Sequence, residues 1–198
     1  MEEDALLTGD PGERRAPRAS PKRVDVTTEE DGDRHRCPRR RGAMLVLWRC
    51  CGQELMLGPQ WHLLLITYAV VLTVSICVDG WVLSSRHTTE RVVGWILTGF
   101  VLACLTALGL GDPGVVHTHA APVGDFSSYC DTCRSFRPIG AIHCNDCQVC
   151  VAGYDHHCPW SSKCIGAKNM VFFNLFLGLL FILMVYDGIE IALLLAKG

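Results

Sequence analysis

The chain has 198 residues, of which 49% are hydrophobic, and a formal net charge of −2. That charge is uninformative about partners, and we expect no nucleic acid among them. The composition changes sharply along the chain, because residues 1–43 are rich in Arg, Glu, Asp, Pro and Gly and contain almost no large apolar groups. Such a segment cannot bury enough surface to offset the entropy lost on ordering, so the composition predicts a disordered tail. The tail also lacks the apolar core of a signal peptide, which leaves the first membrane segment as the anchor.

Two apolar runs predict a pair of transmembrane helices. The run over 61–83 begins with 18 uncharged residues, and the run over 92–110 contains 19. Each is close to the ~20 residues that cross a bilayer core at about 1.5 Å per residue. A buried helix of a soluble protein is the alternative, but the length of both runs favours membrane spans. The short polar link at 84–91 makes the two spans antiparallel neighbours.

A third apolar run covers residues 170–195 and contains two acids, Asp187 and Glu190. A carboxylate at the centre of a membrane helix costs about 2.5–3.5 kcal/mol, and less near an end. We therefore expect Asp187 toward the far interface. The two acids are three residues apart and share one helix face, which in a bundle can point at another helix.

Basic residues near the first span predict its orientation. The arginines before the span are Arg39, Arg40, Arg41 and Arg49, whereas the loop after it offers Arg86 and Arg91. The positive-inside rule therefore places the N-terminus in the cytosol, and the helical hairpin returns residues 111–169 to the same side. Because the cytosol keeps thiols reduced, dense cysteines there indicate metal binding or catalysis rather than disulfides.

Residues 44–60 are expected to form an interfacial segment before the first span. The Leu, Val, Met and Trp residues of 44–57 suit a helix lying in the membrane interface. Cys50 and Cys51 at that depth are candidates for S-acylation. The alternative is that both are ordinary juxtamembrane cysteines.

Half of the 20 cysteines and histidines (12 plus 8) lie between Cys130 and Cys164, in the pattern C-x2-C-x9-H-C-x2-C-x2-C-x4-D-H-H-C-x5-C. The ten positions are Cys130, Cys133, His143, Cys144, Cys147, Cys150, His156, His157, Cys158 and Cys164. Structural zinc takes four ligands, and paired C-x2-C knuckles commonly supply them. Two zincs would use eight of the ten groups. One Cys and one His would remain beside Asp155, and a thiol nucleophile, its base and an orienting acid need such a set.

These residues resemble the cysteine-rich domain of the DHHC protein S-acyltransferases, or palmitoyltransferases. The resemblance covers residues 130–173 and includes Asp155-His156-His157-Cys158, Pro159-Trp160, Cys164, Asn169 and Phe173 at the family's spacing. Asp112-Pro113-Gly114 is similar to the family's DPG element. Ser161-Ser162-Lys163 departs from the family, which usually has an apolar residue and one or two asparagines there.

The resemblance implies two interleaved zinc sites, each with three Cys and one His. The implied ligands are Cys130, Cys133, His143 and Cys150 for one zinc, and Cys144, Cys147, His157 and Cys164 for the other. It also implies that Cys158 is the nucleophile, that His156 is its base, and that Asp155 holds the His156 ring. The expected reaction is a two-step transfer, in which Cys158 takes a palmitoyl-type chain from acyl-CoA and passes it to a cysteine of a protein substrate.

Further residues are expected near the acyl-CoA. Trp160 is expected at the mouth of an acyl pocket formed between the helices. Arg137 and Lys163, with Arg134 and Lys168, can meet the CoA phosphates, although a solvated surface accounts for each of them equally well.

The expected fold is an α-helical integral membrane protein with three transmembrane helices. A small zinc-bound cytosolic domain, residues 111–169, lies between helices 2 and 3. The expected location is an endomembrane, Golgi or endoplasmic reticulum, or the plasma membrane. The family's usual fourth helix and its TTxE element are missing before Gly198, so we expect the acyl cavity to lack one wall and the activity to be reduced.

Two other classes of function are weighed against the transferase. One is a membrane-tethered zinc module, or a catalytically impaired short form, that acts through protein interaction and does not need Cys158. The other is a zinc hydrolase. Two ligand sets made entirely of protein side chains leave no open coordination position, which argues against a hydrolase.

Overall fold

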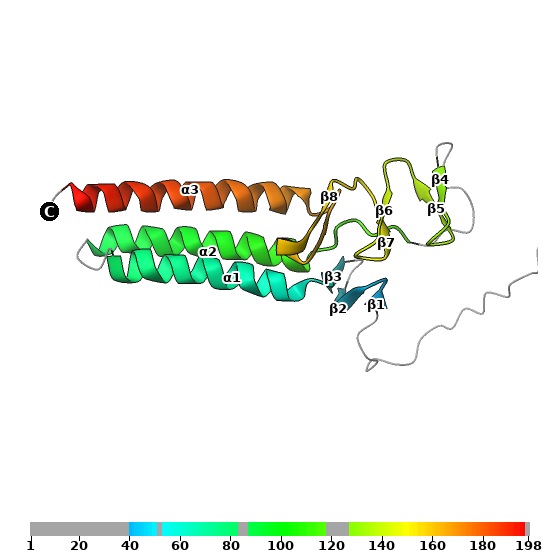
Figure 1. The fold of residues 1–198 in the computed structure, drawn as a ribbon, viewed down its shortest axis with the longest axis horizontal. Helices are drawn as coiled ribbons and strands as arrows, with labels where there is room; N and C mark the ends of the chain where they lie inside the picture. The colour runs from blue at the N-terminus through cyan, green and yellow to red at the C-terminus, as the bar shows by residue number, and fades with distance from the viewer. Residues whose placement is uncertain (1–39, 51–52, 83–86, 118–126, 197–198) are drawn as a thin grey trace, which may run out of the picture. The chain divides into compact units, whose positions relative to one another are not determined.

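The computed structural model describes residues 40–50, 53–82, 87–117 and 127–196. Three long helices lie side by side, and the described strands form small sheets near one end of these helices (Figure 1). Helix α1 covers Trp61–Ser75 and continues into the π-helical segment η1, Ile76–Trp81, whereas α2 covers Thr88–Leu110 and α3 covers Met170–Leu195. All three helices are long and apolar enough to cross a membrane. The prediction of three membrane helices, with a cysteine-rich region between the second and third, is therefore confirmed.

The helices share one apolar core. Helix α2 packs along α3 and also contacts α1. The core residues are Leu64, Val71, Val101, Leu105, Leu108, Phe176 and Leu183 from the helices and Ile165 from the cysteine-rich region. The approach of α1 and α2 is close at Gly109, where a Cβ would lie 2.8 Å from a methyl carbon of Leu64.

A three-stranded antiparallel sheet precedes α1. It contains β1 (Arg40–Arg41), β2 (Met44–Cys50) and β3 (Gln53–Leu57). This sheet corrects two predictions: residues 44–57 form a hairpin instead of an interfacial helix, and regular structure begins inside the predicted tail. The remainder of the tail, residues 1–39, lies outside the described residues, as do Cys51 and the side chain of Cys50.

Burial explains why residues 44–57 form strands. Side chains alternate between the two faces of a strand. Met44, Val46 and Met56 are buried on one face, where they join a core that includes Cys144 and Cys147. The sequence pattern alone did not indicate that the cysteine-rich region would cover this face.

The cysteine-rich region is built from three short antiparallel hairpins. Their strands are β4 (Ser127–Cys130) with β5 (Ser135–Pro138), β6 (Ile142–Cys144) with β7 (Val149–Val151), and β8 (His156–Cys158) with β9 (Lys163–Ile165). A 3-10 turn, η3 (Pro159–Ser161), joins the last two strands. Hairpins this short have little core of their own, so their stability has to come from bound metal and from packing on the helices.

The Asp112-Pro113-Gly114 turn joins α2 to the cysteine-rich region. The Asp112 carboxylate accepts hydrogen bonds from the backbone N–H groups of Gly114 at 2.8 Å and Val115 at 2.9 Å, and the Lys168 ammonium lies 2.6 Å away. Burial alone would raise the pKa of Asp112, but these hydrogen bonds outweigh it and lower the pKa below its usual value. Val115 then pairs with Val151 on β7, so the turn fixes the position of the cysteine-rich region on α2.

Candidate active site and metal centres

The structure brings eight of the ten cysteines and histidines into two groups of four. The first group is Cys130, Cys133, His143 and Cys150, and the second is Cys144, Cys147, His157 and Cys164. Within each group the possible ligand atoms lie within 4.8 Å of one another. The two groups match the sets that the family resemblance implied, and either can bind a metal ion.

Strand pairing places the ligands of each group opposite one another. His143 faces Cys150 across β6 and β7, and His157 faces Cys164 across β8 and β9. The first C-x2-C knuckle is followed by Arg134 and the second by Gln148, and both residues have a positive φ, 50° and 56°. This left-handed turn lets each knuckle fold back on its metal position.

The geometry of both groups fits zinc. In the second group, His157 Nδ1 lies 3.4, 3.5 and 3.6 Å from the sulfurs of Cys144, Cys147 and Cys164. The sulfurs of Cys164 and Cys147 are 3.5 Å apart. A tetrahedral zinc with Cys and His ligands has edges of about 3.5–3.8 Å, whereas a disulfide needs about 2.05 Å.

The first group shows similar spacing. The Cys133 sulfur lies 3.2 Å from His143 Nδ1 and 3.7 Å from the Cys150 sulfur. Burial and the neighbouring thiols of Cys130 and Cys133 raise the pKa of Cys150 to about 12. A bound cation would stabilise these thiols as thiolates.

The second group is fastened to all three membrane helices. The His157 ring uses Nδ1 toward the sulfurs, and its Nε2 lies 2.9 Å from the side-chain oxygen of Gln60, which precedes α1. The Asn169 amide, at the start of α3, donates to the carbonyl of Cys164 at 3.0 Å. Lys163 donates to the carbonyl of Gly109 on α2.

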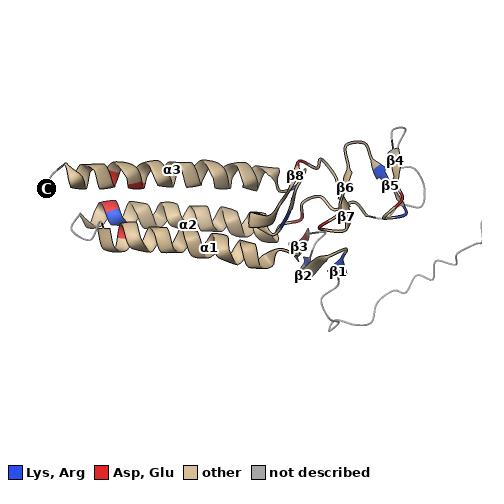
Figure 2. Cartoon of the chain, viewed as in Figure 1, with Lys and Arg blue, Asp and Glu red and all other residues tan. Residues whose placement is uncertain are grey.

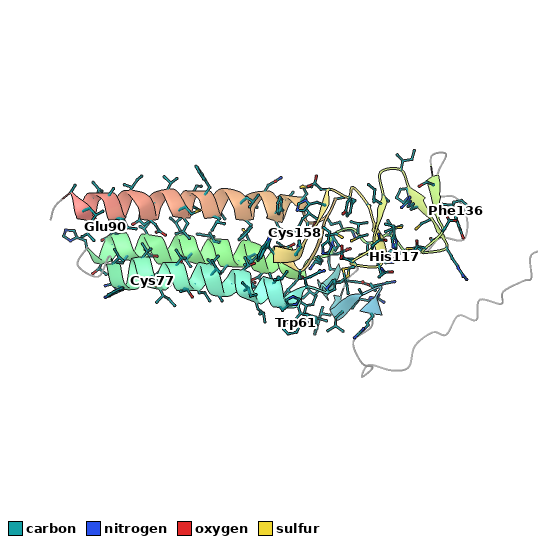
Figure 3. The ribbon with its side chains drawn as sticks, viewed as in Figure 1. Trp61, Cys77, Glu90, His117, Phe136 and Cys158 are labelled. Atoms are coloured by element: carbon teal, nitrogen blue, oxygen red, sulfur yellow. The ribbon has the colours of Figure 1, made fainter. Side chains whose placement is uncertain are left out.

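Strand alternation separates the two adjacent histidines. Along β8, His157 faces the second metal group, so His156 and Cys158 face the opposite side. Both of these side chains line one cavity between α1 and α3. In Figure 3, Cys158 lies where the membrane helices meet the cysteine-rich region.

The His156 ring is held on two sides. Its Nδ1 lies 2.7 Å from the carboxylate of Asp155, and the ring packs edge-on against Phe173 with centroids 5.2 Å apart. The side chains of His156 and Asp155 are 40% and 54% exposed. With Nδ1 engaged by the carboxylate, Nε2 is the nitrogen left to exchange a proton.

The cavity is long and mainly apolar. Its volume is about 680 Å³, and aliphatic and aromatic side chains make most of its lining. Along α3 the lining runs from Phe173 to Asp187, a distance of about 21 Å at 1.5 Å per residue. Such a cavity can hold an extended acyl chain between the two helices.

Of the five residues expected near acyl-CoA, Trp160, Arg137 and Lys163 lie in three different environments. Trp160 lines the cavity and is 58% exposed. Arg137 lies at the first metal group, where its guanidinium is 3.1 Å from the Ser128 hydroxyl and 3.8 Å from the Cys150 sulfur.

Lys163 requires a correction. Its side chain is completely buried, and its ammonium donates to the carbonyls of Met56, at 2.7 Å, and Gly109. Burial lowers the pKa of Lys163 to about 7, although the negative groups of Cys147, Asp112 and Cys164 partly oppose this shift. The ammonium joins β3 to the end of α2 and is not available to a CoA phosphate.

The sequence analysis did not identify two polar residues that support the site. Gln60 orients a metal-facing histidine, and Thr67 on α1 donates to the carbonyl of Trp160 at 3.1 Å. Both lie at the start of an apolar run, where nothing in the pattern distinguishes them from other polar residues near a membrane interface.

Fold and site together define a multi-pass membrane protein with two cysteine–histidine metal groups and a free Cys and His beside an apolar cavity. Residues 124–196 match the family model described as DHHC palmitoyltransferase. The chain is 29% identical over 161 residues to human palmitoyltransferase ZDHHC18, covering 64% of this chain and 42% of the relative. It is 28% identical over 178 residues to probable protein S-acyltransferase 1 of Arabidopsis thaliana, covering 69% and 53%. Human palmitoyltransferase ZDHHC9 is 48% identical over 58 residues, or 29% of this chain and 16% of the relative.

Over residues 124–196 the chain is similar to the DHHC palmitoyltransferases, a family of protein S-palmitoyltransferases that use acyl-CoA. It spans about half or less of the length of these relatives.

Proposed function

We propose that this chain is a protein S-acyltransferase that moves a palmitoyl-type chain from acyl-CoA to a protein cysteine through an acyl-enzyme on Cys158. The observation that carries the proposal is the pairing of His156 and Cys158 on one side of β8, at the end of a long apolar cavity. A thiol beside a base is a nucleophile, and a cavity between membrane helices can hold its acyl chain.

In the first step, His156 accepts the Cys158 proton at Nε2, while Asp155 stabilises the resulting imidazolium through Nδ1. The Cys158 thiolate attacks the carbonyl carbon of the acyl-CoA thioester. The bond from that carbon to the CoA sulfur breaks, and the departing CoA thiolate takes the proton from His156. The acyl chain lies along α1 and α3, and Trp160 packs at the mouth.

In the second step, a cysteine of a membrane-associated protein reaches the same carbonyl carbon. His156 accepts the proton of the incoming thiol, whose sulfur forms the new thioester. The bond to Cys158 breaks, and the Cys158 thiolate recovers the proton from His156. Acyl transfer therefore conserves the number of thioester bonds and needs no oxidant or reductant.

Zinc fits both ligand groups and would supply folding energy rather than chemistry, because each group offers four protein ligands. The residues of the second group place β8 against the helices. We therefore assign Cys144, Cys147, His157 and Cys164 the role of holding Cys158 at the cavity, and Cys130, Cys133, His143 and Cys150 the role of folding the outer hairpins.

We propose Arg137 as a candidate contact for the phosphates of CoA. Lys163 is excluded from this role because its ammonium is buried. The exposed guanidinium of Arg134, next to the first metal group, is a second candidate. We also propose that the N-terminus and the cysteine-rich region are cytosolic, in an endomembrane or plasma membrane, because arginines before α1 exceed those in the following loop.

The test is acyl loading of the purified chain. Incubation in detergent with labelled palmitoyl-CoA should leave label on the protein that hydroxylamine releases, since hydroxylamine cleaves thioesters. Addition of a cysteine-containing membrane-anchored peptide should then move the label to the peptide. A zinc-containing, folded chain that takes up no label would favour the alternative of a membrane-tethered zinc module that acts by protein interaction.

A further inference from the structure

The hairpin of β2 and β3, which replaces the predicted interfacial helix, has two different faces. One face is buried against the cysteine-rich region. The other face is apolar and exposed, and its residues are Leu47, Trp48 and Leu55, which are 48%, 63% and 42% exposed. Single exposed apolar residues are common on proteins, but a group of large ones indicates an interaction surface. We call these three residues the hairpin patch, and the acyl-transfer steps do not use them.

A β-bulge brings Trp48 to the exposed face. The strands pair Val46 with Met56 and then Trp48 with Leu55, so Leu47 is an extra residue in β2. Because side chains alternate along a strand, Trp48 would otherwise share the buried face of Val46. The bulge places Trp48 opposite Leu55 instead, and bulges commonly re-aim a side chain in this way. The hairpin therefore exposes two consecutive large apolar residues, Leu47 and Trp48.

The exposed face of the hairpin continues onto the membrane helices. Leu57 follows Leu55 by two residues on β3 and therefore lies on the same face. Leu57 packs against the apolar core that the three helices share. Trp61, the first residue of α1, is also exposed, and Figure 3 places it beside the N-terminal sheet. The hairpin patch therefore borders the lipid-facing surface of the helices, whereas the opposite face of the hairpin covers the cysteine-rich region.

Two contacts hold the hairpin at the level where the membrane helices end. The Lys163 ammonium joins the carbonyl of Met56 on β3 to that of Gly109 on α2. Because α2 ends one residue after Gly109, β3 lies at the boundary of the membrane span. The backbone N–H of Gly58, directly after β3, donates to the Ser162 hydroxyl at 3.2 Å. Tryptophan is enriched at this level of a membrane protein, where its ring meets the headgroups.

The hairpin also carries an excess of positive charge. Among the described residues of 40–60 there are three arginines, Arg40, Arg41 and Arg49, and one acid, Glu54. Arg41 and Arg49 both form ion pairs with Glu54, so one carboxylate serves two guanidinium groups. Figure 2 shows basic positions on β1 and β2, whereas the middle of the helices carries no charge. In the proposed orientation this end faces the cytosolic leaflet, whose anionic lipids attract basic residues.

We propose that the hairpin patch inserts into the headgroup layer of the cytosolic leaflet and anchors the cysteine-rich region to the membrane surface. Its apolar side chains enter the boundary between headgroups and acyl chains, and the neighbouring arginines contact anionic headgroups, as in amphipathic segments that lie in a membrane interface. Ser162 belongs to the turn that follows Cys158, so the anchored hairpin also fixes the height of Cys158 at the membrane. The use of that height in acyl transfer rests on the proposed function, whereas the anchoring does not.

A variant with a single tryptophan tests the proposal. Trp48 is kept, and Trp61, Trp81, Trp95 and Trp160 are replaced by Phe in the full chain, purified with zinc retained. The protein is reconstituted into vesicles of phosphatidylcholine and phosphatidylserine. The acyl chains of the lipids carry bromine, which quenches tryptophan fluorescence, either near the headgroups or near the chain ends. Trp48 should lose most fluorescence to the bromine near the headgroups and less to the bromine near the chain ends.

The matched control carries its one tryptophan away from the membrane. It has the same four substitutions together with Trp48→Phe and Phe136→Trp, and Figure 3 places Phe136 at the end of the cysteine-rich region remote from the helices. Its fluorescence should be insensitive to bromine at either depth. A folding defect caused by the shared substitutions would appear in both proteins. The fluorescence difference between the wild-type chain and Trp48→Phe alone provides the same measurement without those substitutions.

The charge of the lipid should strengthen the contact. Vesicles of phosphatidylcholine alone should give less quenching of Trp48 by the bromine near the headgroups than vesicles that contain phosphatidylserine. Added salt should remove this difference, because it screens exposed charges. Arg40→Gln combined with Arg49→Gln should reduce the difference in the same way.

Two results would overturn the proposal. In the first, bromine at neither depth quenches Trp48 while acrylamide in the water does, which would show that the hairpin patch faces solvent. In the second, Trp48 is shielded from bromine and acrylamide alike, which would show that a second copy of the chain or another protein covers this face. Neither measurement uses acyl-CoA, so a failure of the anchoring is distinguishable from a failure of the proposed acyl transfer.

Discussion

His157 and Gln60 are joined by a hydrogen bond of 2.9 Å between Nε2 and the side-chain oxygen, across 97 residues of sequence. Because Nδ1 of His157 faces three sulfurs, Nε2 carries the proton and donates it to Gln60. One glutamine at the start of the first membrane helix therefore fixes the orientation of a metal-facing ring that lies next to Cys158 in the sequence.

Gln60→Leu should weaken zinc binding at the second group by about 10–100-fold, because a metal-binding histidine that loses its orienting partner loses affinity. Competition with a graded series of chelators, followed by the release of one zinc before the other, measures this loss. Gln53→Leu is the matched control, since Gln53 is exposed on β3. Equal zinc retention in Gln60→Leu and wild type would show that the hydrogen bond does not support the metal.

Metal removal should affect the two groups differently. Metal analysis should return two zincs per chain. Cys147→Ala should unfold β8 and β9 and abolish acyl loading, because it removes a fully buried ligand from the group that contains His157 of β8 and Cys164 of β9. Cys133→Ala should leave that group intact and disturb the outer hairpins first, because Cys133 belongs to the other group. Limited proteolysis with mapped cleavage sites separates the two outcomes, and identical cleavage patterns would contradict the separate roles.

Lys163→Met should destabilise the protein by about 2–3 kcal/mol, because two buried carbonyls, of Met56 and Gly109, lose their donor. Lys168→Met is the control, since Lys168 is 54% exposed and its ion pair with Asp112 is worth at most about 1 kcal/mol. Thermal unfolding compares the two variants. A larger loss for Lys168→Met would mean that the buried ammonium is not a structural tie.

Topology provides a prediction independent of catalysis. An N-glycosylation acceptor introduced at 84–91 should be modified in cells, and one introduced at 120–128 should not, if the cysteine-rich region is cytosolic. The opposite pattern would place the thiols in an oxidising compartment, where disulfides compete with metal binding.

The three membrane helices could be predicted from the sequence because a membrane span needs only length and apolar character. The third prediction, 170–195, agrees with the bounds of α3, Met170–Leu195. The second span begins four residues earlier than predicted, at Thr88, since Glu90 and Arg91 are polar but still helical. Hydropathy therefore does not predict that charged residues at the end of a span belong to the helix.

The ligands of the two metal groups could also be predicted from the sequence, because the spacing of Cys and His resembles that of a family with known ligand sets. The N-terminal hairpin could not be predicted, since its strands are stabilised by packing in one core with Cys144 and Cys147, which follow almost 90 residues later. The burial of Lys163 was missed for the same reason, because the carbonyls that bind its ammonium belong to β3 and α2. Contacts of this kind depend on how distant segments meet, which a local pattern does not contain.

Acyl loading at one sulfur tests the central claim most directly. The wild-type chain and a Cys158→Ser variant are each analysed for zinc, incubated with palmitoyl-CoA and examined by intact-protein mass spectrometry. Our account predicts one hydroxylamine-sensitive acyl group on the wild type, mapped to Cys158, and none on the variant, with Cys77→Ser loading as the wild type does. Acyl loading that persists in Cys158→Ser, or a loss of zinc together with the loss of loading, would contradict the assignment of Cys158 as the nucleophile.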